Sequence, residues 1–178
     1  MKTAIFIDGG YISKILKKES HNISVDYEKL VKELVPVKDN LLRTYYYDCE
    51  PYQSSPPTDD EKQRFSKSQL FHHKLKSLSK FDVKLGKLQK IKDTFKQKGV
   101  DVLLSIDLVE LSLINKIDNA ILIAGDSDYI PAITRVKAHG VTVHLYHSQN
   151  TSEYHRELWE ICDKRTSITI DLINKIKM

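Results

Sequence analysis

Three aspartates in this chain follow two short apolar segments, and together they could bind a metal ion. Residues 3–7 are almost wholly apolar and are followed by Asp8, and residues 120–124 lead into a Gly-Asp-Ser-Asp run that contains Asp126 and Asp128. Such segments are typical of parallel strands buried on both faces, whose ligands gather beyond the carboxyl ends. Carboxylates grouped there repel one another unless a cation lies among them. The pattern therefore predicts a hard divalent metal that serves phosphate chemistry.

Two further acids lie shortly before the second of these strands. A very apolar helix is predicted over residues 102–117, with Asp101 at its start and Asp107 about 9 Å further along the helix axis. Because a crossover helix starts at the edge where the strands end, Asp101 is level with the other acids. We predict that Asp101 is a metal ligand, and that Asp107 and Ser127 support the ligands from behind.

Each of these acids also has a purely structural explanation. Asp8 could bond its own backbone in a turn, and Asp101 or Asp128 could cap a helix. Asp107 could be a buried acid that is paired with a basic group. Two capping-type acids after one buried strand, Asp126 and Asp128, nevertheless exceed what a single helix cap requires, and this favours the metal site.

Strands and helices alternate along the chain, which places the acids on a parallel sheet. A capping box, Thr58-x-x-Glu61, marks the start of one helix, and Gly140 marks the end of another. The other predicted strands cover residues 41–47, 81–85, 141–146 and 168–170, and the other predicted helices cover residues 11–18, 26–35, 128–139, 153–162 and 172–177. Residues 86–99 look basic and irregular. This alternation predicts an α/β fold around a parallel sheet.

The composition is that of one folded domain. The chain has 178 residues, of which 40% are hydrophobic and 29% charged, so it can bury a sizeable core. No apolar run approaches the roughly 20 residues of a membrane span, and no cleavable signal peptide precedes the first strand. We therefore expect a cytoplasmic protein without membrane attachment, in which Cys49 and Cys162 are reduced thiols.

Basic residues concentrate in one segment, residues 61–98, which we call the basic belt. It contains twelve Lys or Arg and three Asp or Glu, a net charge of +9, whereas the whole chain carries +4 and the remainder therefore −5. A metal-dependent nuclease needs this combination, because lysines attract phosphates while acids hold the metal. The residues predicted to contact substrate are Lys74, Lys76, Lys84, Lys98 and Tyr11, the last by stacking on a base. The belt could instead be a solvated helix face, and Tyr11 could be ordinary packing.

Four ordered segments of the sequence resemble a known family. They are residues 5–12 (IFIDGGYI), 45–48 (YYYD), 98–102 (KGVDV) and 123–131 (IAGDSDYIP). As a set they resemble the bacterial NYN domains of the LabA-like type, which belong to the PIN-like nuclease superfamily. The resemblance extends over residues 1–150 and implies a Rossmann-like, PIN-like three-layer sandwich with a mainly parallel central sheet. It implies a single domain over residues 1–178, with a helical extension over residues 151–178.

The resemblance also implies an activity, a cofactor and a partner. NYN domains of this type are metal-dependent endoribonucleases, so we expect one or two Mg²⁺ or Mn²⁺ ions and an RNA substrate, single-stranded in preference to duplex. The implied metal ligands are Asp8, Asp101, Asp126 and Asp128, and Asp107 matches a frequent acid of the subgroup. This chain departs from the family pattern at Tyr11, because many NYN domains have Asn shortly after the first Asp. An oligomeric state and a protein partner stay unassigned.

Other functions that could use these acids meet specific objections. A haloacid-dehalogenase-like phosphatase needs a second acid two residues after Asp8, where this chain has Gly10. A toprim-type fold could use the Asp126 and Asp128 pair but expects Glu at the first strand. A dinucleotide-binding domain would need a Gly-x-Gly-x-x-Gly motif directly after a strand, and none of the predicted strands is followed by one. The alternative that stays open is a non-catalytic RNA-binding or regulatory module that retains the NYN fold, although unpaired buried acids would be costly in it.

Overall fold

The protein is built on one β-sheet whose strands are mostly parallel. The computed structural model describes residues 1–20, 23–37, 39–91, 94–114 and 116–178, with the backbone alone for residues 19–20, 88–91 and 94–98. The strands in this part of the chain are β1 (Lys2–Asp8), β2 (Asn40–Cys49), β3 (Phe81–Ile91), β4 (Thr94–Lys98), β5 (Asn119–Ile123), β6 (Thr142–Ser148) and β7 (Lys164–Ile168). They lie side by side in the order β4-β3-β2-β1-β5-β6-β7.

The chain reverses its direction of travel across the sheet between β1 and β5. From β1 it moves outward through β2 to β3, then returns to the other side of β1 and moves outward again through β5, β6 and β7. These strands are parallel to one another, whereas β4 is antiparallel to β3 and forms a hairpin with it. Ile7 of β1 lies opposite Ile123 of β5. In open parallel sheets, ligands bind beyond the carboxyl ends of the strands at such a reversal.

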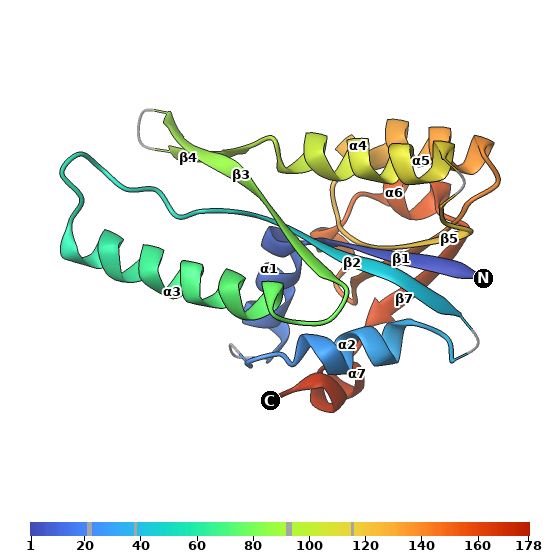
Figure 1. The fold of residues 1–178 in the computed structure, drawn as a ribbon, viewed down its shortest axis with the longest axis horizontal. Coiled ribbons are helices and arrows are strands. Elements are labelled where there is room, and N and C mark those ends of the chain that lie inside the picture. Colours follow the sequence, from blue (N-terminus) through green and yellow to red (C-terminus); the bar gives the residue numbers. More distant parts are fainter. Residues whose placement is uncertain (21–22, 38, 92–93, 115) are drawn as a thin grey trace.

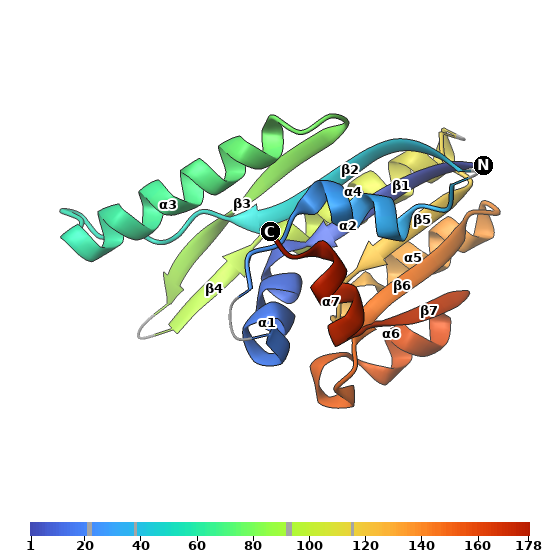
Figure 2. The same cartoon turned by 90° about the horizontal axis from the view of Figure 1, so that it is seen from below.

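Helices cover both faces of the sheet (Figures 1 and 2). The described helices are α1 (Gly9–Ser20), α2 (Tyr27–Leu34), α3 (Asp59–Lys76), α4 (Val100–Leu113), α5 (Ile130–Ala138), α6 (Arg156–Ile161) and α7 (Ile170–Ile176), with short 3₁₀ turns η1 (Ser127–Tyr129) and η2 (Thr151–Glu153). One core lies between the sheet and α1, α2, α3 and α7, and it contains Ile5 and Ile7. The other lies beneath α4, α5 and α6, and it contains Ala4 and Phe6. The predicted three-layer sandwich with a mainly parallel sheet is confirmed.

Local signals in the sequence fix where the helices near the site begin. The predicted capping box is present, because Thr58 Oγ1 accepts the Glu61 N–H at 3.2 Å and the Glu61 carboxylate accepts the Thr58 N–H at 2.9 Å. Gly99 precedes α4 with a φ of +88°, a left-handed conformation that glycine adopts without strain. Helix α4 therefore starts at Val100, two residues before the predicted start, and Asp101 lies in its first turn.

Two stretches differ from the secondary structure that the sequence predicts. Within residues 86–99, predicted to be irregular, residues 86–91 belong to β3 and residues 94–98 to β4, because a hairpin at the edge of a sheet does not need apolar alternation. The last strand is β7 over Lys164–Ile168 and not residues 168–170, and most of its residues are exposed. The chain after residue 150 thus contributes an edge strand to the sheet in addition to helices α6 and α7.

The end of the molecule that carries the hairpin also carries α3. In Figure 1, α3 and the β3–β4 hairpin extend to the left, beyond the other strands. Cys49 and Cys162 are buried free thiols, as predicted. None of the helices in the described ranges combines the length and the apolar character needed to cross a membrane.

Candidate active site

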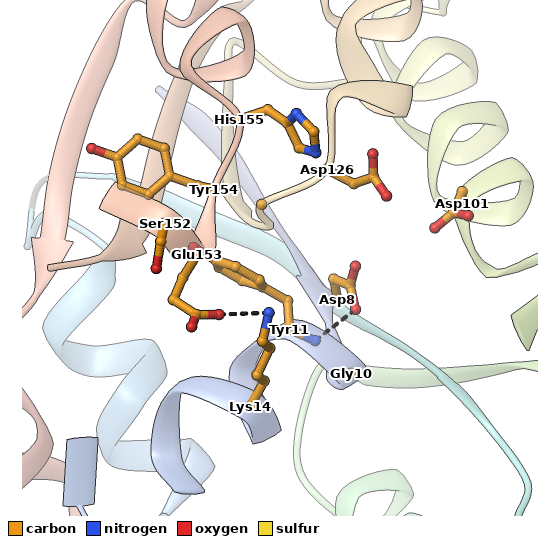
Figure 3. A pocket seen from close by; sticks show the side chains of 11 residues that line it. Asp8, Gly10, Tyr11, Lys14, Asp101, Asp126, Ser152, Glu153, Tyr154 and His155 are labelled. Carbon is orange, nitrogen blue, oxygen red and sulfur yellow. Dashed lines mark hydrogen bonds and ion pairs between the residues drawn. The ribbon is translucent and has the colours of Figure 1, made fainter. Parts of the chain in front are cut away.

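A cavity of about 480 Å³ opens at the carboxyl edge of the sheet, where the chain reverses between β1 and β5. Its acidic wall consists of Asp8 at the end of β1, Asp101 in α4 and Asp126 after β5. Its opposite wall, which we call the lysine wall, consists of Lys14 in α1 and residues 152–155 (Figure 3). The sheet therefore brings together side chains from distant segments of the sequence, as the pattern of the strands predicts.

One tyrosine joins two of the acids. The hydroxyl of the buried Tyr129 lies 3.0 Å from Asp8 Oδ2 and 3.0 Å from Asp101 Oδ1. A hydroxyl has a single proton and can donate to only one carboxylate at a time. The other carboxylate then faces a lone pair of the tyrosine oxygen, which is repulsive. A proton on that carboxylate or a cation beside it would remove the repulsion.

The surroundings of Asp8 disfavour its negative charge. Burial raises the pKa of Asp8 above its ordinary value of 3.8, and the charges of Asp101 and Asp48 raise it further. The N–H of Tyr11, which donates to Asp8 Oδ1 at 3.0 Å, and the Tyr129 hydroxyl act in the opposite direction. Burial and the two carboxylates also raise the pKa of Tyr129 far above its ordinary value, so its hydroxyl keeps its proton. A bound cation would relieve the repulsion that Asp8 experiences.

The two aspartates that follow β5 have different positions. Asp126 lines the cavity and also caps the η1 turn, because its Oδ1 accepts the N–H of Asp128 at 3.1 Å. Both aspartates are exposed, but Asp128 is not part of the cavity wall. Of the predicted metal ligands, the structure thus brings together Asp8, Asp101 and Asp126. Ser127 begins the η1 turn between the two acids and does not line the cavity.

The acidic wall offers oxygen donors that suit a hard divalent cation. Among the residues that the structure describes, no three His, Cys, Asp or Glu side chains form a ready-made metal-binding cluster. Mg²⁺, however, usually takes only one or two carboxylates from a protein, and water and substrate phosphates occupy its other positions. Asp8 and Asp101, which converge on one hydroxyl, offer such a pair, and Asp126 lines the same cavity. The chemistry of these side chains therefore fits Mg²⁺ or Mn²⁺.

Two glycines allow close packing next to the acids. A Cβ at Gly9 would lie 2.7 Å from the ring of Tyr46. A Cβ at Gly125 would lie 2.2 Å from the ring of Tyr11 and 2.7 Å from the carbonyl oxygen of Glu153. Neither position can hold a side chain unless its neighbours move. Gly125 in particular lets the lysine wall come close to the strand end that carries Asp126.

Tyr11, predicted to contact substrate, lines the cavity but is largely buried. Its exposed fraction is 8%, and its hydroxyl accepts the N–H of Ser148 at the end of β6 at 3.0 Å. Its ring occupies the space that Gly125 leaves open. These contacts connect β6 to the start of α1, which is the packing role that the sequence left open for Tyr11.

Asp107 is not one of the residues that line the cavity. It accepts the hydroxyl of Tyr47 at 2.7 Å and pairs with Lys84 Nζ at 2.7 Å. The structure therefore places it in the paired, largely buried setting that the sequence left open as an alternative. Lys84, which was predicted to contact substrate, is thus engaged in an ion pair with Asp107. Its Nζ also lies 5.5 Å from the centre of the Tyr45 ring.

Two of the other lysines predicted to contact substrate, Lys74 and Lys76, do not line the cavity. Lys74 and Lys76 are exposed in the last turn of α3. Lys98 ends β4, just before Gly99 and α4, but its side chain lies outside the described part of the structure. The substrate contacts of these lysines stay predictions.

Sequence reasoning missed the lysine wall. Glu153 in η2 forms ion pairs with Lys14, at 2.5 Å, and with Lys18, and both lysines lower its pKa below the ordinary value. The N–H of His155 donates to the carbonyl oxygen of Gly125 at 2.9 Å, which joins this wall to the acidic one. One signal could have found it: the residues after β6 must emerge at the same edge of the sheet as the acids, since β6 is parallel to β5.

A further acid at this edge was also missed. Asp48 near the end of β2 lies 3.0 Å, through Oδ2, from Nε2 of the buried His72 in α3. Its charge contributes to the raised pKa of Asp8. It belongs to the Tyr-Tyr-Tyr-Asp segment that was noted in the sequence, and it links α3 to the edge of the sheet that carries the cavity.

Comparisons with known proteins agree with this architecture. Residues 2–169 match the NYN domain family. The crystal structure of a protein of unknown function from Vibrio parahaemolyticus has a similar fold, with a TM-score of 0.71 and 20% sequence identity, over 99% of this chain and 96% of that chain. At this identity the likeness concerns the fold alone. A comparison with curated proteins gives no match.

Proposed function

The chain belongs to the NYN domain family, and from this premise we propose that it is a metal-dependent endoribonuclease that hydrolyses phosphodiester bonds of single-stranded RNA. NYN domains have the PIN-like fold, and members of the family are generally nucleases. One observation carries the proposal for this chain: Asp8 and Asp101 converge on the hydroxyl of Tyr129 inside a cavity at the point where the sheet reverses.

The acidic wall would bind the metal. Asp8, Asp101 and Asp126 would hold one or two Mg²⁺ or Mn²⁺ ions, and the role of Asp128 as a further ligand stays a prediction. The metal would lower the pKa of a bound water and stabilise negative charge on the phosphate, which is the chemistry that phosphodiester hydrolysis needs. We expect products with a 5′-phosphate and a 3′-hydroxyl.

The protein groups around the acids would hold them in place. The N–H of Tyr11 fixes one oxygen of Asp8, and the Tyr129 hydroxyl, which lies 3.0 Å from both carboxylates, can bond one of Asp8 and Asp101 at a time. Because Asp126 also caps η1, its carboxylate is restrained by the backbone and not by a flexible side-chain partner. Such preorganised groups need no rearrangement when charge develops on the substrate.

Charge and its distribution support RNA as the partner. The basic belt carries a net +9, and exposed lysines such as Lys74 and Lys76 in α3 can attract a phosphate backbone without sequence preference. Single-stranded RNA fits the proposal because an unpaired backbone can enter a cavity that a duplex cannot.

A cleavage assay tests the proposal. Wild type, Asp126→Asn and the control Asp171→Asn, which removes an exposed acid in the first turn of α7, are each incubated with labelled single-stranded RNA and Mn²⁺ or Mg²⁺. We expect wild type and the control to cut and Asp126→Asn to lose at least about 100-fold in rate, which corresponds to about 2.7 kcal/mol of activation free energy. Equal rates for wild type and Asp126→Asn would place the chemistry elsewhere. RNA binding without cutting would instead favour a non-catalytic RNA-binding module.

A further inference from the structure

The lysine wall faces the acidic wall across the cavity and presents positive charge at its rim. Lys14 and Lys18 lie one helical turn apart on α1, so both side chains extend from the same face. Both form ion pairs with Glu153, whose side chain is only 5% exposed, whereas the lysine side chains are 52% and 57% exposed. The carboxylate is thus enclosed, and the two ammonium groups remain open to solvent.

This cluster carries more positive charge than Glu153 requires. One lysine would neutralise the carboxylate, and a second like charge four residues away on a helix is unfavourable by itself. The cluster therefore retains a net charge of about +1, and each ammonium group has three N–H donors, of which the carboxylate uses only part. The remaining donors of Lys14, the lysine that lines the cavity, are available to an anion there.

The position of this charge relative to the acids is fixed by the backbone. The N–H of His155 bonds the carbonyl oxygen of Gly125, the residue before Asp126. The missing side chain of Gly125 also allows the carbonyl of Glu153 to pack against the same strand end. Figure 3 shows Glu153 joined to Lys14 on one side of the cavity and the carboxylates of Asp8, Asp101 and Asp126 on the other. The cavity therefore has one place for a cation and, facing it, one place for an anion.

We propose that Lys14, held by Glu153 and supplemented by the charge of Lys18, is a subsite for a second phosphate of the RNA, next to the phosphate that is cut. The inference rests on the proposed function, because it takes the acidic wall as the place of the scissile phosphate. RNA carries a phosphate on every nucleotide, so a strand that presents one phosphate to the acidic wall presents a neighbouring one to the same cavity. That neighbour is either an internal phosphate or the 5′-phosphate of a strand end.

The pairing also makes Lys14 a suitable position to change. When Lys14 is replaced, Glu153 keeps Lys18 as a partner, so no buried carboxylate is left without a cation. Lys17 supplies the matched control, since it is an exposed lysine of the same helix that does not line this cavity. Lys14→Met and Lys17→Met remove the same charge from the same helix.

The experiment measures KM, kcat and the salt dependence of RNA binding for wild type, Lys14→Met and Lys17→Met. Short single-stranded RNAs with a 5′-hydroxyl or a 5′-phosphate serve as substrates. We expect Lys14→Met to raise KM about tenfold with little change in kcat, as loss of a contact made equally in the ground state and the transition state does. It should also make the salt slope of binding shallower by about 0.7, the value for one lost phosphate contact on a single strand.

The two substrates identify the source of the phosphate. A rise in KM for both RNAs assigns the subsite to an internal phosphate, and a rise confined to the 5′-phosphorylated RNA assigns it to a strand end. If wild type cuts RNA but the two lysine variants have the same KM, the subsite is overturned while the proposed function stands. If wild type neither cuts nor binds RNA, the proposed function fails and the subsite fails with it.

Discussion

Helix α4 carries two aspartates that each lie against a tyrosine hydroxyl, but among the side chains that the structure describes only Asp107 has a cation beside it. Asp107 accepts the hydroxyl of Tyr47 at 2.7 Å and is neutralised by Lys84 Nζ at 2.7 Å. Tyr47 is fully buried, Asp107 is almost fully buried, and the lysine closes the group toward solvent. Asp107 therefore has the surroundings of an acid that stabilises the fold.

Asp101, six residues earlier in the same helix, has the opposite arrangement. Its carboxylate shares the Tyr129 hydroxyl with a second carboxylate, that of Asp8, and no described lysine or arginine forms an ion pair with either of them. Burial, together with the charge of Asp101, raises the pKa of Asp8. The comparison teaches that a tyrosine contact alone does not distinguish the two roles. The identity of the third group does: a lysine completes the pair at Asp107, whereas a second acid at Asp101 leaves negative charge that the proposed metal would neutralise.

The largest expected difference between the two groups is in catalysis. Asp101→Asn should lower the rate of RNA cleavage at least about 100-fold, or about 2.7 kcal/mol, because it removes one of the proposed metal ligands. Asp107→Asn, the same change two turns along the helix, should keep cleavage within about threefold of wild type when both are assayed at a temperature where they are folded. Equal losses for the two variants would mean that Asp107 contributes to the chemistry and that the comparison is wrong.

The second expected difference is in the response to metal. Mn²⁺ at about 100 times its dissociation constant should stabilise the wild-type fold by about 2.7 kcal/mol, which raises the thermal midpoint by about 5 to 10 °C for a chain of this length. Asp107→Asn should show the same rise from its own lower starting point. Asp101→Asn should show little or no rise in the thermal midpoint. Thermal unfolding of each variant with Mn²⁺ and with chelator measures this rise.

The third expected difference is in the stability of the metal-free protein. Asp107→Asn should lower the free energy of unfolding by about 1 to 2 kcal/mol, at the low end for a broken buried pair because Lys84 is partly solvated. Urea unfolding checks this, with Asp101→Asn as the comparison that should cost less. The double variant Asp107→Asn, Lys84→Met should lose less than the two single changes together, since the second change removes a group that the first has left unpaired.

The smallest expected effect concerns pH. The folded-state pKa of Asp8 lies above its ordinary value of 3.8, so on raising the pH the unfolded chain loses this proton first. Stability of the metal-free protein is therefore lost as the pH rises from the unfolded pKa through the folded pKa, and the loss remains at neutral pH. Asp8→Asn removes that penalty while keeping an oxygen that accepts the Tyr11 N–H.

The measurement compares the urea midpoints of Asp8→Asn and wild type, both with chelator. We expect a small gain for Asp8→Asn at pH 7 that disappears below the unfolded pKa of about 3.9, where both states are already protonated. A gain of the same size at both pH values would attribute it to packing and not to charge.

The sequence predicted the acids at strand ends well, for a physical reason. Parallel strands bring their carboxyl ends to one edge, so Asp8 and Asp126 had to be neighbours once their strands were recognised. The position of Asp101 at the same edge followed because a crossover helix starts where the strands end. Asp128 could not be separated from Asp126 in this way, because the 3₁₀ turn η1 decides which of the two faces the cavity, and nothing in the residue types specifies that turn.

Groups that depend on contacts between distant segments were beyond the sequence. The pairs between Glu153 and the lysines of α1, and between Asp107 and Lys84, join residues that carry no shared motif. The pairing of β3 with β4 was missed because an edge hairpin tolerates polar residues where a central strand does not. In each case the contact depends on which distant segment packs against the side chain once the sheet has formed.

The walls of the cavity also have an order of synthesis. Asp8 is made first, Asp101 and Asp126 follow more than ninety residues later, and the His155 N–H that fastens the lysine wall comes last. A ribosome at about 5 to 20 residues per second needs several seconds to travel this distance. During that time the nascent chain emerges beside ribosomal and messenger RNA with its first carboxylate exposed but without its partners. Because the cavity is divided among four distant segments, it cannot form until residue 155 has been synthesised.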